Sequence, residues 1–209
     1  LENTTTGAGY NFDMVDSSGT SRIRNVNGIL RLGADHRNEV ADSNIRLEVD
    51  GSERMRIDND GLKFNGDTAA ANALDDYEEG TWTPSYRNGA TEMTYTMGNE
   101  RAEYRKIGDT VWIHLGFRFT ALSGTGTGSF RIYGLPFTAK NNGAYQEYRF
   151  SCAAGNNVNT GNSDRVFGFS SNGNSYLEFR IMDAVDTVFR SNEMDSNSFM
   201  SVWGFYVVA

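Results

Sequence analysis

The sequence contains little proline, one cysteine, two histidines and no long run of apolar residues. The single thiol, Cys152, cannot form a disulfide within one chain, and its alternating neighbours predict a small buried residue on a strand. The two histidines, His36 and His114, cannot build a Cys/His zinc site within one chain. Because no segment approaches 18 apolar residues, a transmembrane helix is not expected.

Positive charge is also scarce. The net charge is −8, and 38% of the residues are apolar, which is enough for a packed core. Residues 1–80 hold 16 acidic and 8 basic side chains, whereas residues 81–209 hold 11 of each. We therefore expect two regions with different roles, and we expect no nucleic-acid partner, since binding one requires basic surface.

We expect no secretory signal within the first twenty residues, because they lack an apolar core. Since the chain begins with Leu1 rather than Met, we expect it to be a fragment or a processed product of a longer protein. Residues 1–20 are rich in Thr, Gly, Asn and Ser without a period, which predicts a linker or extended chain.

A short apolar–basic–apolar unit recurs after residue 22, as in 30–32, 45–47, 55–57 and 62–64. Each copy has the period of a strand with one apolar face. Parity pairs Ile45 with Ile57 and Leu47 with Met55 if a three-residue loop, 50–52, places Val49 opposite Glu53 and Glu48 opposite Arg54. A four-residue loop, 58–61, pairs Ile57 with Leu62 and Met55 with Phe64.

Such short ribbons leave an apolar face without cover. The same face of other copies can cover it, so residues 1–66 are predicted to form an extended segment and a trimeric β-shaft. The predicted shaft interface consists of Ile45, Leu47, Met55, Ile57, Leu62 and Phe64.

Residues 67–80 are expected to form a short helical and acidic junction. The alanines of 67–74 favour about two helical turns, which Asp67 or Thr68 can cap. The segment 58–61 resembles the start of a calcium loop, but its twelfth position is Ala69 instead of Glu, so a plain turn is predicted and no metal is expected.

Residues 81–209 read as many short strands separated by Gly and Asn, which predicts an antiparallel β-sandwich head in an all-β chain. The expected strands are 81–86, 92–97, 101–106, 110–120, 128–133, 147–153, 165–170, 175–182, 186–190 and 198–208. The glycines of 123–128 do not have the spacing of a phosphate or dinucleotide loop, so no cofactor is expected.

Strand 110–120 has one face for the core, with Val111, Ile113, Leu115, Phe117 and Phe119. Its other face carries Trp112, His114 and Arg118, which indicates a subunit interface, a contact with a glycan or ion, or a surface covered by a local loop. The last strand is apolar on both faces, which indicates burial on both sides. We therefore add Trp112, His114, Trp203 and Tyr206 to the predicted trimer interface.

Several ordered motifs within about residues 44–137 resemble tail-fibre and receptor-binding proteins of bacteriophages. These motifs are 53–58 with Gly61, 73–84, 104–111 and 133–137. The terminal strand is similar to trimeric jelly rolls of the complement and tumour-necrosis-factor type. The resemblance implies a homotrimeric fibre on the tail of an extracellular virion. Its jelly-roll-like head would attach to the host, and the fibre would contact other tail proteins. Insertion into a membrane is not implied. It implies no particular binding residues.

The predicted function is receptor binding, with a glycan as the expected ligand, and the alternatives are a purely structural fibre or decoration protein and a glycan depolymerase. A depolymerase needs two carboxylates in a cleft. The carboxylates of 75–79 lie at a junction, and neither histidine lies in a triad pattern, so we do not expect an enzyme. Polar loops suit sugar recognition. The candidate receptor-binding residues in these loops are Tyr86, Asn88, Asn141, Tyr145 and Asn157.

Overall fold

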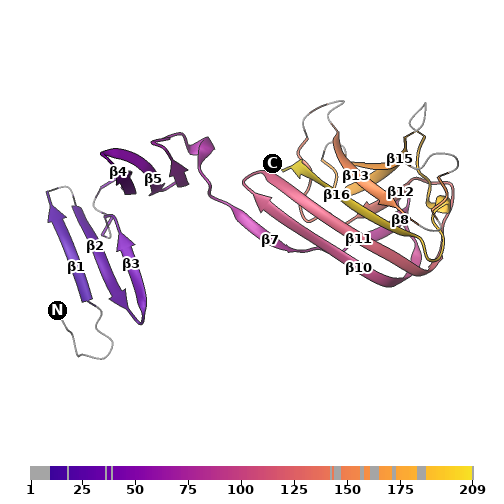
Figure 1. The fold of residues 1–209 in the computed structure, drawn as a ribbon, viewed down its shortest axis with the longest axis horizontal. Helices are drawn as coiled ribbons and strands as arrows, with labels where there is room; N and C mark the ends of the chain where they lie inside the picture. The colour runs from indigo at the N-terminus through magenta and orange to yellow at the C-terminus, as the bar shows by residue number, and fades with distance from the viewer. Residues whose placement is uncertain are drawn as a thin grey trace. The chain divides into compact units, whose positions relative to one another are not determined.

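The computed structural model describes residues 10–17, 19–35, 37–38, 40–141, 143, 147–155, 158–160, 165–170, 173–182 and 187–208. The chain divides into two compact units, Leu1–Asp75 and Asp76–Ala209. Both are built from antiparallel strands, which confirms the predicted all-β class (Figure 1). No helix within the described residues is long and apolar enough to cross a membrane.

The first unit begins with a three-stranded sheet made of β1 (Tyr10–Asp16), β2 (Gly19–Val26) and β3 (Ile29–Gly33). Residues 1–20 were predicted as a linker or extended chain, and from residue 10 the extended chain is a paired strand and not a linker. Polar residues hide the strand period in the sequence, but β1 pairs along its whole length with β2. An ion pair between Arg22 and Asp13, which lie opposite each other, supports this pairing.

A second three-stranded sheet contains β4 (Ile45–Val49), β5 (Ser52–Asp58) and β6 (Gly61–Phe64). The predicted pairs of Ile57 with Ile45 and with Leu62 are confirmed, as are those of Met55 with Leu47 and with Phe64. These six residues therefore share one face of the sheet.

The first turn of this sheet differs from the prediction. Val49 pairs with Ser52, and Glu48 faces Glu53 instead of Arg54. Asp50 and Gly51 both have positive φ, at 51° and 70°, which fits a two-residue turn of the I′ type. A β-bulge beside Leu47 then restores the apolar register, because the extra residue returns the side chains to their face.

The predicted two-turn helix at 67–74 is also wrong, because the chain forms only one 3-10 turn, Ala70–Asn72. The Asp67 side chain accepts a hydrogen bond from the Ala69 amide at 2.9 Å just before this turn, but no side chain caps the turn itself, so the predicted cap is not formed. The turn ends at once because Leu74 forms a β-bridge with Leu62, through hydrogen bonds of 2.8 and 3.1 Å. This bridge holds Leu74 in extended chain.

The second unit is one ten-stranded antiparallel sheet in the order β7-β10-β11-β16-β13-β14-β15-β12-β8-β9. A second 3-10 turn, η2, spans Ser191–Glu193. The strands are β7 (Tyr77–Thr81), β8 (Ser85–Asn88), β9 (Thr91–Glu92), β10 (Thr94–Ile107), β11 (Thr110–Ser123), β12 (Phe130–Tyr133), β13 (Tyr148–Ala154), β14 (Val166–Ser170), β15 (Tyr176–Ile181) and β16 (Phe199–Val207).

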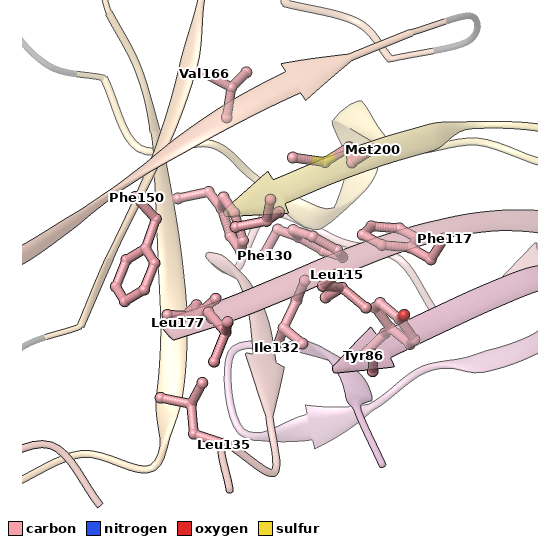
Figure 2. Packing of buried hydrophobic residues seen from close by; sticks show 14 of the residues in the cluster. Tyr86, Leu115, Phe117, Phe130, Ile132, Leu135, Phe150, Val166, Leu177 and Met200 are labelled. Carbon is pink, nitrogen blue, oxygen red and sulfur yellow. The ribbon is translucent and has the colours of Figure 1, made fainter. Parts of the chain in front are cut away.

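The sheet rolls over on itself, as the ring contacts between distant strands show. Tyr86 of β8 lies 4.6 Å from the Phe117 ring of β11, although five strands separate β8 and β11 in the sheet. We call β7, β10, β11 and β16 the first layer, and β13, β14, β15, β12 and β8 the second layer. Side chains from both layers meet in one core (Figure 2). This arrangement is consistent with the predicted β-sandwich.

The alternation predicted for strand 110–120 is confirmed. Its five inward side chains are buried, and Trp112, His114 and Arg118 are exposed. Two expected strands, 92–97 and 101–106, are parts of the single strand β10, which continues through an irregularity between Thr96 and Asn99. Within the expected strand 186–190, isolated bridges are found at Val188 and Arg190.

Candidate functional site

The outer face of the first layer gathers aromatic side chains into two neighbouring rows. Trp112 of β11 lies opposite Phe205 of β16, and their rings are 6.4 Å apart. In the next row His114 lies opposite Trp203. We call Trp112, His114, Trp203 and Phe205 the aromatic face.

These side chains are largely open to solvent. Trp112 is 43% exposed, Trp203 44% and Phe205 55%, so no loop of the described residues covers them. A local loop, one of the three explanations considered for Trp112, is therefore excluded within the part of the chain that the structure describes. Contiguous exposed aromatic surface is typical of contact sites.

Charged residues of β7 and β10 border the aromatic face. Arg105 lies opposite Trp112 and forms an ion pair with Glu79 at 3.7 Å. Arg101 bonds Glu103 at 2.8 Å, and this hydrogen bond holds the pKa of the Glu103 carboxyl below its ordinary value. The border therefore carries both signs of charge in fixed pairs.

A groove of about 660 Å³ lies between these charged residues and one side of the aromatic face. The groove is lined by charged side chains, including Glu79, Arg101, Glu103 and Arg105, and by Trp112 and His114. An indole flanked by paired charges suits either a sugar ring, which stacks on aromatic surfaces, or another protein surface.

Two further kinds of site were considered among the described residues, a reactive thiol and a metal site. Cys152 is half-buried, and burial raises the pKa of its thiol to about 12, which leaves it protonated at neutral pH. Within the described ranges, no three His, Cys, Asp or Glu side chains are placed to hold a metal ion.

The first unit presents a second apolar surface, the shared face of β4, β5 and β6. Leu47, Ile57 and Phe64 on this face are exposed by 54%, 52% and 48%, and the other three predicted shaft-interface residues are half-buried. The opposite face contains polar groups, among them the buried Lys63. One chain therefore leaves the predicted shaft interface uncovered.

Tyr206 does not belong to the predicted interface. Its side chain is fully buried in the chain's own core, where its hydroxyl donates to the Phe137 carbonyl oxygen at 3.0 Å. Residues two apart on a strand share a face, so Trp203 and Phe205 point outward while Tyr206 points inward. The same parity could have identified Phe205, which the sequence prediction missed.

Tyr86 is not a loop residue on a receptor-binding surface, as was predicted. It lies on β8 and is fully buried, and its hydroxyl donates to Glu100 at 2.8 Å (Figure 2). Burial raises the pKa of this hydroxyl. The physical reason is the non-local pairing of β8 with β12, which turns Tyr86 into the core.

The remaining receptor-binding candidates are scattered. Asn88 is half-buried at the end of β8, where it lies against Gly126 and Gly128. Asn141 is exposed, and its side-chain oxygen accepts a hydrogen bond from the Gly143 amide at 3.1 Å. Tyr145 and Asn157 lie outside the described residues, as does His36. No cluster of these candidates is seen among the described residues.

Comparison with known proteins adds one finding about the fold. No protein-family profile and no curated protein sequence matches the chain. The fold is similar to part of the crystal structure of Dettilon tailspike protein (gp208), with a TM-score of 0.51 and 14% identical residues. The match covers 66% of this chain and 25% of that chain, so this chain corresponds to about a quarter of that tailspike protein.

Proposed function

We propose that the chain is part of a bacteriophage tail fibre or tailspike, located in the virion, and that it works as a homotrimer. The fold likeness to a tailspike protein supports this proposal, as do the motifs that resemble phage fibre proteins. In this proposal the first unit forms the shaft, and the second unit forms a head that binds a host-surface receptor.

The observation that carries the proposal is the exposed aromatic face. Trp112, Trp203 and Phe205 lie on rigid strands of the sheet, not on loops, so they cannot fold away from water. Burying apolar surface contributes about 25 cal/mol per Å², which makes a contact at this face favourable. We assign the face to the contact between copies.

The same argument from exposed apolar surface applies to the proposed shaft. Three copies that meet at Leu47, Ile57 and Phe64 exclude water from side chains that one chain leaves exposed. Arg46, which belongs to the other side of β4, then points outward. Each unit of a single chain thus leaves an apolar surface exposed to water. In this proposal, association of three chains covers both surfaces.

Receptor binding by the head is the proposed activity, and catalysis is not part of the proposal. Its partners are two further copies of the chain, a host-surface glycan or protein, and other tail proteins of the virion. The alternative is a purely structural role as a fibre or decoration protein.

Binding of the full chain to host cells tests the function. A receptor-binding head attaches to susceptible cells and blocks phage adsorption, whereas a purely structural fibre does neither. Release of reducing ends from host polysaccharide would instead show a depolymerase.

A further inference from the structure

The outer face of the second layer carries an arrangement of arginines and aromatic rings that the trimer contact does not use. One row crosses five neighbouring strands at matched positions. From β8 to β13 it consists of Arg87, Arg131, Glu178, Phe169 and Arg149.

Each arginine of this region lies over an aromatic ring. The guanidinium of Arg87 is 4.4 Å from the centre of the Tyr133 ring, and that of Arg131 is 4.8 Å from the Tyr176 ring. Tyr133 and Tyr176 stack on each other, with their centres 4.6 Å apart. The two guanidinium groups are thus fixed by planar contacts, which lowers the entropy lost when they bind a ligand.

Part of this arrangement has a structural explanation. Phe167 and Phe169 point outward from β14 but are only 8% and 5% exposed, because Arg149 and Arg180 lie over them at 4.8 and 5.0 Å. The stems of these two arginines cover apolar rings.

Arg87 and Arg131 also lie over rings, but covering a ring does not explain why these two side chains are paired with each other. They lie directly opposite each other on β8 and β12, and like charges in that position destabilise a sheet. Glu178 neutralises Arg131 through a bond of 2.7 Å. Arg87 donates to the Ser85 hydroxyl and the Ala90 carbonyl, both neutral. Glu92 of β9 lies opposite Arg87 on its other side, but no ion pair between Arg87 and a carboxylate is found among the described residues.

We propose that this face binds an acidic glycan, whose carboxylate or sulfate groups accept hydrogen bonds from Arg87 and Arg131. This proposal names a site and a ligand class for the receptor-binding head, so it rests on the proposed function. Planar guanidinium groups recognise such anions through paired donors. A bound anion also removes the repulsion between the two opposed arginines.

The charge distribution favours a glycan over a nucleic acid. Residues 81–209 carry 11 acidic and 11 basic side chains, so this part of the chain has no excess of positive charge to attract a densely charged polymer. The row itself contains Glu178 between its arginines, so its positive charges are few and separated. A polymer with occasional anionic groups along a neutral chain fits this pattern.

The test measures binding of the full chain to three immobilised polymers, which are partly methyl-esterified polygalacturonate, lightly sulfated dextran and neutral dextran. We expect binding to one or both acidic polymers, no binding to dextran, and weaker binding as salt is raised. The double variant R87Q/R131Q should lose about tenfold or more in affinity, because it removes charge-assisted hydrogen bonds. The matched control R31Q/R54Q makes the same charge change at exposed arginines of the first unit and should bind as the unchanged chain does.

A second variant, R87K/R131K, tests whether lost binding could result from misfolding. It keeps both positive charges but loses the planar donors, and it should also weaken binding. Equal binding by the unchanged chain and R87Q/R131Q, or no binding to either acidic polymer, would overturn the site. Binding to duplex DNA as tight as to the acidic polymers would overturn the glycan class. If the chain still attaches to host cells in these cases, the proposed function survives; if it attaches to no cell, that function fails too.

Discussion

Trp112 and Phe205 lie opposite each other on the neighbouring strands β11 and β16 of the first layer, with their rings 6.4 Å apart and both exposed. Two large aromatic side chains placed together on the outside of a rigid sheet indicate a contact that one chain does not supply. The first prediction concerns this pair.

Replacing both residues, as in W112S/F205S, should weaken the association between copies, because it removes the apolar surface of one of the two rows of the aromatic face. The mass in solution should fall toward that of one chain at low concentration. The control M182S changes another half-exposed apolar residue and should leave the mass unchanged. An unchanged mass for W112S/F205S would place the contact elsewhere.

The shaft face gives a second prediction. Ile57→Asp places a charge in the proposed three-fold shaft core and should disrupt it, since a buried unpaired carboxylate is costly. Arg46→Gln makes the same change in net charge on the other side of the hairpin and should be tolerated. Limited proteolysis of the first unit is the measurement, and equal cleavage of both variants would argue against a shaft core at Ile57.

Tyr86→Phe tests whether this side chain is structural. The variant loses the hydrogen bond to Glu100 but keeps the ring, so the free energy of unfolding should fall by about 1 kcal/mol. Host-cell binding should stay the same, because Tyr86 is buried. Weaker binding in a variant of nearly unchanged stability would restore Tyr86 as a receptor contact.

The pH dependence of the shaft hairpin supplies a fourth prediction. Lys63 is buried, and its ammonium group bonds Asp58 at 3.0 Å and Asp60 at 2.5 Å. The bond from Lys63 lowers the pKa of Asp58 below the ordinary 3.8. The stabilisation is therefore present above about pH 4 and is lost as pH falls through the lowered pKa.

Hydrogen exchange of the segment 53–64 measures this effect. Its protection should be lower in Lys63→Met than in the unchanged chain at pH 7, and the difference in opening free energy should shrink below pH 4. A difference that is the same at pH 7 and pH 3 would show that Lys63 acts through packing and not through its charge.

Local parity in the sequence was enough to predict the strand pairs of the shaft hairpins and the two faces of β11. It failed where pairing depends on distant strands. The direction of Tyr86 follows from the pairing of β8 with β12, more than forty residues further along the chain. The Arg87–Arg131 opposition follows from the same pairing, so no local pattern could reveal it.

Other errors were local. The helix predicted from alanine content does not form, because Leu74 forms a bridge with Leu62. This tertiary contact outweighs the helix propensity of the alanines. The loop at Asp50–Gly51 is one residue shorter than expected, because both residues take positive φ and a bulge absorbs the difference. Tyr206 lies three residues after Trp203, so the two-residue period of a strand places the two side chains on opposite faces. Applying this period would have assigned Tyr206 to the core.

The mass of the full chain in solution, measured by light scattering, tests the central claim most directly. One chain has a mass of 23.2 kDa, so a trimer has three times that mass, about 70 kDa. The account predicts about 70 kDa at micromolar concentration. A mass of about 23 kDa would contradict it, because the aromatic face and the shaft face would then remain open to water.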